Sequence, residues 1–296
     1  MTFTHYLLNL EKDIKAHIEY LLCVKINGVK AISGGDISKA FLLETESERF
    51  FCKVNSSSQA LRMLQAEKVG LDHIAKTKTI ATPKVLLCES LENGAFLLME
   101  FIAPKRPSVD DMALLGRQLA ALHQMETSGA FGFKNDNFIG SLPQSNSWHD
   151  DWATFYFHER LLPQLKIALD NQSLLSSQIP SENQLMKVFH NLLPKTKPAL
   201  LHGDLWAGNY IIGSNGTPFL IDTAVYYGHH EVDLAMSRLF GGFDSSFYDA
   251  HKEVFPEIGG EKERSDFYQL YYLLVHLNLF GRSYLGPVRA ILKRYF

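Results

Sequence analysis

A short polar segment in the second half of the chain constrains the fold more than any other part of the sequence. Residues 202–209 read His-Gly-Asp-Leu-Trp-Ala-Gly-Asn, so Asp204 and Asn209 lie five positions apart in one predicted loop. The apolar run 219–221 then leads directly to a second carboxylate, Asp222. Phosphoryl transfer from ATP requires a carboxylate that orients a hydroxyl and accepts its proton, together with two oxygen ligands for magnesium. The spacing therefore predicts a catalytic loop followed by a short strand that ends at a metal ligand.

Each polar residue of this segment has a predicted role. Asp204 is the predicted catalytic base, and Asn209 and Asp222 are the predicted Mg²⁺ ligands, since hard oxygen donors suit a hard ion. His202 is expected to brace the loop by hydrogen bonding. The alternative is an ordinary surface turn, because Gly, Asp and Asn are common turn formers. A surface turn would explain neither the spacing nor the strand before Asp222, so the catalytic interpretation is favoured.

The same spacing is found in a known template. Protein kinases separate their catalytic Asp and metal-binding Asn equally, with a strand-terminal Asp downstream. This chain has neither HRD nor DFG, and its HGD…N…D version resembles the kinase-like small-molecule phosphotransferases, such as the aminoglycoside and choline kinases. Trp206 narrows the resemblance. The run HGDLW-x-GN, followed by ID-x-A-x-x-YGH-x-E-x-(D/E)-L-A in residues 221–235, is similar to the fructosamine kinase family.

This resemblance implies an enzyme that uses ATP and Mg²⁺ to phosphorylate a hydroxyl of a ketosamine, the sugar adduct of an amine. It implies the 3-hydroxyl of fructosamine, ribulosamine or a related adduct, either small or carried on a protein lysine. Deglycation would follow, because phosphorylated ketosamines break down readily.

Two other interpretations stay open, and the second of them comes from a different functional class. One is a kinase-like phosphotransferase that acts on an aminoglycoside, choline or a free sugar, and Trp206 argues against it. The other is a catalytically inactive nucleotide-binding module. The combined presence of Lys53, Asp204, Asn209 and Asp222 argues against an inactive module.

The first hundred residues predict a small β-rich lobe. The pattern contains two strand-like runs, one run with apolar residues at helical spacing, and two strands around an Asn-Gly turn: residues 39–45, 49–54, 60–74, 85–88 and 96–99. Pro104 and Pro107 then break the chain, and helical patterns dominate afterwards. We therefore expect a bilobal, protein-kinase-like α+β fold. A small antiparallel β lobe with one main helix would span 1–101, and a larger, mainly helical lobe would span 102–296.

The larger lobe is expected to contain several helices. Helical patterns cover residues 112–122, 152–162, 165–192 and 266–292. Pro163 is expected to close the second of these, and a polar break is expected within the third at 173–181. A further break is expected at Gly286-Pro287.

Lys53 lies within the strand-like run 50–54, where a lysine is otherwise out of place. A cation at this position is expected to reach the α- and β-phosphates of ATP. Glu67, fourteen residues further on, is expected to pair with Lys53 and fix its position. The alternatives are an edge-strand lysine facing water and an exposed helix charge. The pattern Phe-x-Lys-Val-Asn in 51–55 resembles the fructosamine kinases.

Two further segments are expected to contact the nucleotide. Gly34 and Gly35 lie in a predicted turn upstream of Lys53, where glycine would let backbone amides approach phosphate, although an ordinary turn has the same composition. The interlobe connection, where backbone groups would meet adenine, is expected at Met99, Glu100 and Phe101. A strand end that packs in the core is the alternative for these side chains.

The acceptor side of the site is predicted from a second block of resemblance. Residues 132–140 and 143–148 look like the fructosamine kinase pattern GF-x-x-DN-x-IG…PQ-x-N-x-W. Aromatic and amide side chains suit a pocket that stacks on and hydrogen-bonds a polyol. Asn137, Trp148 and Trp206 are therefore the predicted substrate-binding residues. The alternative for Trp206 is a core tryptophan that braces the loop.

Composition argues against several other kinds of partner. A formal net charge of −3 gives no general attraction to nucleic acid or to an anionic membrane. The longest apolar stretch, 270–280, is too short to span a bilayer. Three cysteines without a CxxC motif fit a reducing compartment. We therefore expect a cytoplasmic protein with no nucleic-acid and no membrane partner, and the sequence carries no indication of its oligomeric state.

Overall fold

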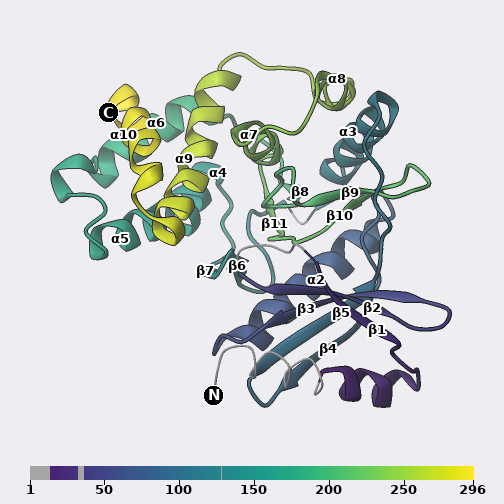
Figure 1. Cartoon of the computed structure of the whole chain (residues 1–296). Helices are drawn as coiled ribbons and strands as arrows, with labels where there is room; N and C mark the ends of the chain where they lie inside the picture. The colour runs from purple at the N-terminus through teal and green to yellow at the C-terminus, as the bar shows by residue number, and fades with distance from the viewer. Residues whose placement is uncertain (1–13, 33–36, 128) are drawn as a thin grey trace.

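The computed structural model describes residues 14–32, 37–127 and 129–296, which form two lobes (Figure 1). The smaller, β-rich lobe is built from the first third of the chain, and the larger lobe is mainly helical. The predicted bilobal α+β fold is therefore confirmed. Gly34 and Gly35 lie outside the described residues, and so does the predicted phosphate-covering turn. Among the described residues, no helix has the length and apolar character needed to cross a bilayer.

The small lobe is one antiparallel sheet with a helix on each face. After a leading helix at residues 14–22, its elements are β1 (Gly28–Ile32), β2 (Lys39–Glu44), β3 (Arg49–Asn55), α2 (Ala60–Thr77), β4 (Val85–Leu91) and β5 (Gly94–Glu100). The five strands lie in the order β1-β2-β3-β5-β4, and every pairing is antiparallel. The predicted order of strand pair, helix and hairpin is present.

The side chains of β5 show how this sheet is covered. Ala95, Leu97 and Met99 pack against α2, whereas Phe96 and Leu98 pack beneath the leading helix. This division follows from strand geometry, because successive side chains point to opposite faces of a sheet.

The larger lobe packs helices around short two-stranded sheets. Its elements are α3 (Val109–His123), β6 (Asn137–Ile139), β7 (Leu142–Gln144), α4 (Trp152–Phe155), η1 (Tyr156–Leu161), α5 (Leu162–Asp170), η2 (Ser176–Gln178), α6 (Glu182–Leu192), β8 (Ala199–Leu201), β9 (Tyr210–Ile212), β10 (Pro218–Leu220), β11 (Tyr226–Gly228), α7 (Glu231–Leu239), α8 (Ser245–Lys252), α9 (Glu261–Phe280), η3 (Arg282–Tyr284) and α10 (Leu285–Tyr295). β6 pairs with β7, β8 with β11, and β9 with β10. The three pairs lie near the small lobe (Figure 1).

The expectation that Pro163 closes a helix was wrong. The chain passes from α4 through the π-helical turn η1 into α5, and Pro163 lies in the first turn of α5. Proline cannot donate a hydrogen bond to the carbonyl of Glu159, four residues earlier. The Nη1 group of Arg160 donates to that carbonyl instead, at 2.8 Å. The wider π turn therefore carries the helical path past the proline.

The predicted break at Gly286-Pro287 was also misplaced. The long helix α9 ends at Phe280, and the next residue, Gly281, has φ of 88°. Gly286 and Pro287 lie within the first turn of α10. Proline is tolerated there because the first amides of a helix have no intrahelical partner.

Candidate active site

The loop at residues 202–209 joins β8 to β9 and is held from behind by Asp233 of α7. Asp233 Oδ2 accepts the backbone N–H of His202 at 2.8 Å, and Oδ1 accepts that of Gly203 at 2.9 Å. His123, the last residue of α3, places Nε2 3.1 Å from Asp233 Oδ2. Burial alone would raise the pKa of Asp233, but these hydrogen bonds outweigh burial and hold it below its usual value. An ionised Asp233 therefore fixes the backbone of the loop.

Gly203 lets the loop pass close to the segment that follows β10. It has φ of +85°, and a Cβ at this position would lie 2.0 Å from the carbonyl oxygen of Ala224. No larger residue fits there unless the backbone moves. The Tyr272 hydroxyl of α9 donates to the Gly203 carbonyl at 2.7 Å. The loop is thus anchored to α9 as well as to α7.

The side chain of His202 links the loop to the strand that precedes Asp222. Its Nδ1 accepts the backbone N–H of Asp204 at 3.1 Å, so Nε2 carries the proton and donates to the carbonyl of Ile221 at 2.8 Å. Burial lowers the pKa of His202, which favours this neutral form. The hydrogen bonds are of the bracing kind expected from the sequence.

Asp204, Asn209 and Asp222 converge at the open side of the loop. Asn209 Nδ2 donates to Asp204 Oδ2 at 3.2 Å and to the Asp204 carbonyl at 2.8 Å. Asp222 has φ of 53°, an uncommon conformation for a residue with a side chain. Burial, followed by the nearby charge of Asp222, raises the pKa of Asp204 to about 7.

These residues fit a divalent cation. The Asp222 carboxylate and the Asn209 amide supply hard oxygen donors of the kind that Mg²⁺ takes in proteins. Burial, and after it the negative charge of Asp222, raise the pKa of Asp204, so the two carboxylates repel each other when both are ionised. A cation between the two carboxylates would relieve that repulsion.

Lys53 of β3 lies between two carboxylates. Its Nζ is 2.9 Å from Glu67 Oε2 of α2 and 2.5 Å from Asp222 Oδ1. Burial would lower the pKa of Lys53, but Asp222 and Glu67 together raise it above its usual value. The lysine is therefore charged and joins the small lobe to the end of the catalytic segment.

One cavity of about 530 Å³ contains the open side of this cluster. Its lining includes Lys53, Glu67, Asp204, Asn209 and Asp222. The connection from β5 to α3 runs along the opposite side of the molecule from α9 and the β6–β7 hairpin (Figure 1). Residues 99–101 are absent from the described lining, whereas 138–140 of the hairpin and several α9 residues belong to it. The cavity therefore extends from the catalytic cluster away from the interlobe connection.

Trp206 also lines this cavity, and 39% of its surface is exposed. Its ring lies over Gly208, where a Cβ would come within 2.3 Å of the ring. The side chain is therefore at the wall of the cavity and not in the core of the lobe.

Two of the predicted substrate-binding residues lie outside the described lining of the cavity. Asn137 is buried, donates to the Val225 carbonyl at 2.8 Å and accepts from Gln144 Nε2 at 2.7 Å. Its amide thus joins β6 to β7 and to the segment before β11. Trp148 is 48% exposed and stacks on Tyr227 with 6.1 Å between ring centroids. Both side chains make protein contacts outside the described lining of the cavity, and their predicted contact with substrate stays a prediction.

The predicted interlobe segment turns its side chains away from the cavity. Met99 is buried in the small-lobe core, and Glu100 Oε1 accepts the backbone N–H of Lys84 at 2.9 Å. The Arg49 guanidinium lies 4.9 Å from the centroid of the Phe101 ring. Any contact of this segment with a nucleotide would therefore have to come from backbone groups, which is the kind of contact that the sequence predicts.

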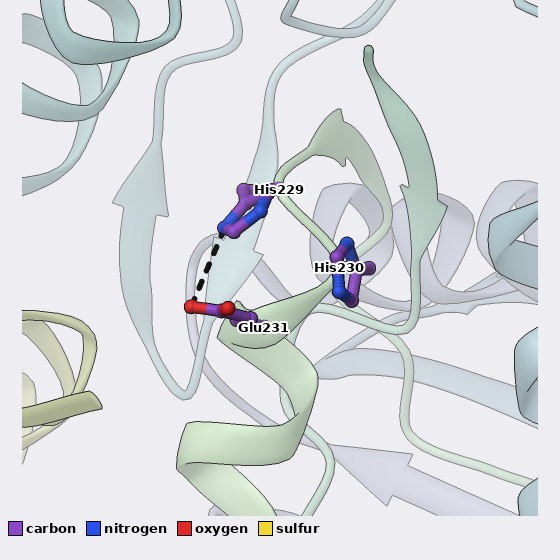
Figure 2. Close-up of side chains that lie close together, drawn as sticks. All are labelled: His229, His230 and Glu231. Carbon is purple, nitrogen blue, oxygen red and sulfur yellow. Dashed lines mark ion pairs between the residues drawn. The ribbon is translucent and has the colours of Figure 1, made fainter. Parts of the chain in front are cut away.

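Another group of potential metal ligands lies behind the loop, at the start of α7 (Figure 2). His229, His230 and Glu231 place one potential ligand atom each within 4.8 Å of one another. Figure 2 shows His229 facing Glu231, and the dashed line marks a separation of 3.8 Å. Both Glu231 oxygens, however, accept hydrogen bonds from Arg264 at 2.6 Å. The guanidinium already neutralises the carboxylate, so this cluster braces α7 against α9.

The sequence reasoning missed the contribution of His123 and Tyr272 to the loop. These residues are 110 positions from Asp233 and 69 positions from Gly203, respectively. Neither residue lies in a recognisable local motif. The available signal was weak: each is a residue with a polar group within a helical pattern, and such groups are hydrogen-bonded when they are buried.

Comparison with protein families gives a match over nearly the whole chain. The model described as fructosamine kinase matches residues 11–296. A probable ketoamine kinase of Enterococcus faecium is 39% identical over 275 residues, which cover 92% of this chain and 97% of that protein. The chloroplastic protein-ribulosamine 3-kinase of Arabidopsis thaliana is 38% identical over 276 residues, covering 92% of this chain and 83% of that protein.

Solved structures show the same relationship. The "putative fructosamine-3-kinase" of Haemophilus somnus superimposes with a TM-score of 0.85 at 27% identity, covering 96% of this chain and 97% of the other. An aminoglycoside phosphotransferase superimposes with a TM-score of 0.60 at 15% identity, covering 95% of this chain and 98% of the other. At that identity the second likeness shows the fold alone.

Proposed function

The chain belongs to the fructosamine kinase family, and on that premise we propose that it transfers the γ-phosphate of ATP to a hydroxyl of a ketosamine. The enzyme is an ATP-dependent kinase that acts on a hydroxyl group. The observation that carries the proposal is the convergence of Lys53, Asp204, Asn209 and Asp222 at one end of a single cavity. Aminoglycoside and choline kinases share the fold, but no described contact favours their substrates.

Asp204 is the proposed catalytic base. Its Oδ2 accepts from Asn209, so Oδ1 is available to orient the acceptor hydroxyl and take its proton. The transition state of phosphoryl transfer is loose, so the proton moves late and positioning supplies most of the rate enhancement.

The remaining residues of the cluster are proposed to neutralise the negative charge of the phosphates. We propose that Asn209 and Asp222 hold Mg²⁺, which supplies charge neutralisation for the phosphates when it is bound. Lys53 would turn from Asp222 toward the α- and β-phosphates while Glu67 keeps hold of it. Gly34 and Gly35 would cover the phosphates, and backbone groups of residues 99–101 would meet adenine.

The two lobes divide this work. Residues 1–101 are the proposed nucleotide-binding lobe, and residues 102–296 carry the catalytic loop and the acceptor site. Trp206 is the proposed acceptor-side contact, because its ring lines the cavity two residues beyond Asp204. A protonated secondary amine or an apolar stem could rest on its face.

The proposed acceptor group is the 3-hydroxyl of a ketosamine of the fructosamine or ribulosamine type. The proposed substrates include adducts on protein lysines. The name of the Arabidopsis relative supports the protein-linked class for that protein. Deglycation would be the consequence of such phosphorylation. The three cysteines are free, which supports the cytoplasmic location expected from the sequence.

An ATP-consumption assay with a substrate panel tests this function. The panel contains ketosamines, the corresponding free sugars, choline and an aminoglycoside. We expect ATP turnover with the ketosamines alone. Turnover with choline or the aminoglycoside, and none with any ketosamine, would refute the proposal.

A further inference from the structure

Part of the lining of the active-site cavity is a group of aromatic rings that contact one another. Phe240, His276, Phe280 and Tyr284 all line it, and together we call them the aromatic collar. The His276 ring is central: its centroid lies 4.8 Å from that of Phe240, 5.0 Å from that of Tyr284 and 5.5 Å from that of Phe280. The collar is therefore one contiguous aromatic surface.

Helix ends hold the collar in place. Phe240 follows the last residue of α7, and Phe280 is the last residue of α9. Gly281, with φ of 88°, then reverses the chain, so that Tyr284 at the end of η3 meets His276 one turn inside α9. The arrangement depends on three rigid elements and not on a long loop.

The two phenylalanines of the collar are not buried in the core. Phe240 is 43% exposed and Phe280 is 46% exposed. Large aromatic side chains that remain half-exposed around a concave site are typical of ligand contact. Phe240 and Phe280 are half-exposed at the same cavity that contains the catalytic cluster. Part of the bound substrate could therefore cover their rings.

Charge is distributed unevenly along the cavity. Among the described lining residues, the acidic and basic side chains other than histidine are Lys53, Glu67, Asp204 and Asp222, all in the catalytic cluster. Sugar hydroxyls need hydrogen-bond partners, since burial without a partner is costly. The polyol therefore suits the catalytic end, and the collar suits an apolar group.

We propose that the aromatic collar binds the substituent on the amine nitrogen of the ketosamine, and that it selects aromatic or long alkyl substituents over small polar ones. This inference rests on the proposed function. A ketosamine carries its nitrogen at C1, two carbons from the 3-hydroxyl. When that hydroxyl lies at Asp204, the nitrogen substituent must continue along the cavity or out of it. The collar covers that path with rings that can bury an apolar stem.

An apolar substituent on the amine nitrogen can come from two kinds of substrate. One is a free amine with an aromatic or alkyl group, and the other is the four-carbon stem of a lysine in a peptide. The exposed faces of Phe240 and Phe280 place the collar where a chain can leave the cavity. A kinetic panel therefore compares fructose adducts of ammonia, glycine, butylamine, benzylamine and the Nε group of lysine in a short peptide.

The wild-type enzyme should phosphorylate the benzylamine adduct with about tenfold higher kcat/KM than the ammonia adduct, the size of effect that a small apolar contact gives. Phe280→Ala should remove most of that preference, with less than about a twofold change for the ammonia adduct. Phe240→Ala should act in the same direction. Tyr20→Ala removes an exposed aromatic residue of the small lobe and is the matched control, for which every ratio should stay unchanged.

The outcomes distinguish failure of the collar proposal from failure of the proposed ketosamine kinase function. A higher kcat/KM than that of the ammonia adduct for both the butylamine and the peptide-lysine adducts supports binding of both kinds of substituent by the collar. A higher kcat/KM for the adducts of free amines alone assigns the collar to small-molecule substrates. Equal kcat/KM for all adducts overturns the collar and leaves the ketosamine kinase function standing. Equal losses on every adduct in both phenylalanine variants, with unchanged melting temperatures, also overturn it. If no adduct is phosphorylated, the proposed function fails and the collar proposal fails with it.

Discussion

Lys53 Nζ and Asp222 Oδ1 lie 2.5 Å apart although 169 positions separate them in the sequence. The pair joins β3 of the small lobe to the turn after β10 of the larger lobe. Lys53 also holds Glu67, so a single ammonium group neutralises carboxylates from both lobes. A nucleotide that enters with a metal ion must therefore exchange the Lys53–Asp222 contact for new ones. We therefore propose that Lys53 and Asp222 join the lobes before binding, and that afterwards Lys53 contacts the phosphates while Asp222 holds Mg²⁺.

Replacement of this lysine should affect both catalysis and stability. Lys53→Met should raise KM for ATP and lower kcat, because phosphate charge loses its partner. In the absence of ligand it should also reduce the free energy of unfolding by about 3 kcal/mol, since two largely buried carboxylates are left without a cation. Urea unfolding and steady-state kinetics measure the two effects.

Lys68→Ala is the matched control for that variant. Lys68 pairs with Asp72 on the exposed face of α2, where both side chains are 41% exposed. Its loss should change stability by less than about 0.5 kcal/mol. Equal losses in the two variants, or an unchanged KM for ATP in Lys53→Met, would contradict the assignment.

Removal of the proposed base should separate chemistry from binding. Asp204→Asn should lower kcat about a thousandfold, the range expected for loss of acid–base catalysis, while ATP affinity stays within a few fold. Isothermal titration with a non-hydrolysable ATP analogue gives the affinity, and single-turnover kinetics give the rate. Near-native turnover in this variant would remove Asp204 from the mechanism.

Asp233 should control the loop without touching the substrate. Asp233→Asn replaces one of two acceptors for the His202 and Gly203 amides by a donor, so a buried N–H loses its partner. The cost should be about 2 kcal/mol of unfolding free energy, together with a lower kcat. Asp170→Asn, an exposed change at the end of α5, should alter neither quantity.

The stability contribution of Asp233 should depend on pH in a defined direction. Its pKa in the folded state is lowered, so its contribution is fully present above the ordinary aspartate pKa of about 3.9 and is lost as pH falls through the folded value. The difference in the free energy of unfolding between wild type and Asp233→Asn should therefore become smaller below about pH 4. A difference that stays constant between pH 7 and pH 3 would show that the carboxylate charge contributes nothing.

Trp206 should act on the acceptor and not on the nucleotide. Trp206→Ala should lower kcat/KM for ketosamines by about tenfold or more, since a ring contact and any cation–π attraction are lost. The dissociation constant of ATP should change little. Parallel losses in both quantities would indicate collapse of the loop around Gly208.

The sequence predicted those parts of the site that depend on short-range spacing. The Lys53–Glu67 pair and the loop from Asp204 to Asn209 span fourteen and five positions, and strand and helix geometry then fix their relative placement. The sequence could not show that the Asn137 amide joins strands, because its hydrogen bond to the Val225 carbonyl crosses 88 positions. The aromatic collar went unnoticed for a similar reason. Its rings meet only through the packing of α7 against α9 and the reversal at Gly281.

The position of the transferred phosphate tests the central claim most directly. The purified protein is incubated with ATP, Mg²⁺ and a fructose adduct of benzylamine, and the product is analysed by phosphorus–proton correlated NMR. We predict a single product whose phosphorus couples to the proton on C3 of the sugar, and no product with Asp204→Asn. A phosphate on another hydroxyl, or no product from ketosamines alongside clear phosphorylation of choline or an aminoglycoside, would contradict the account.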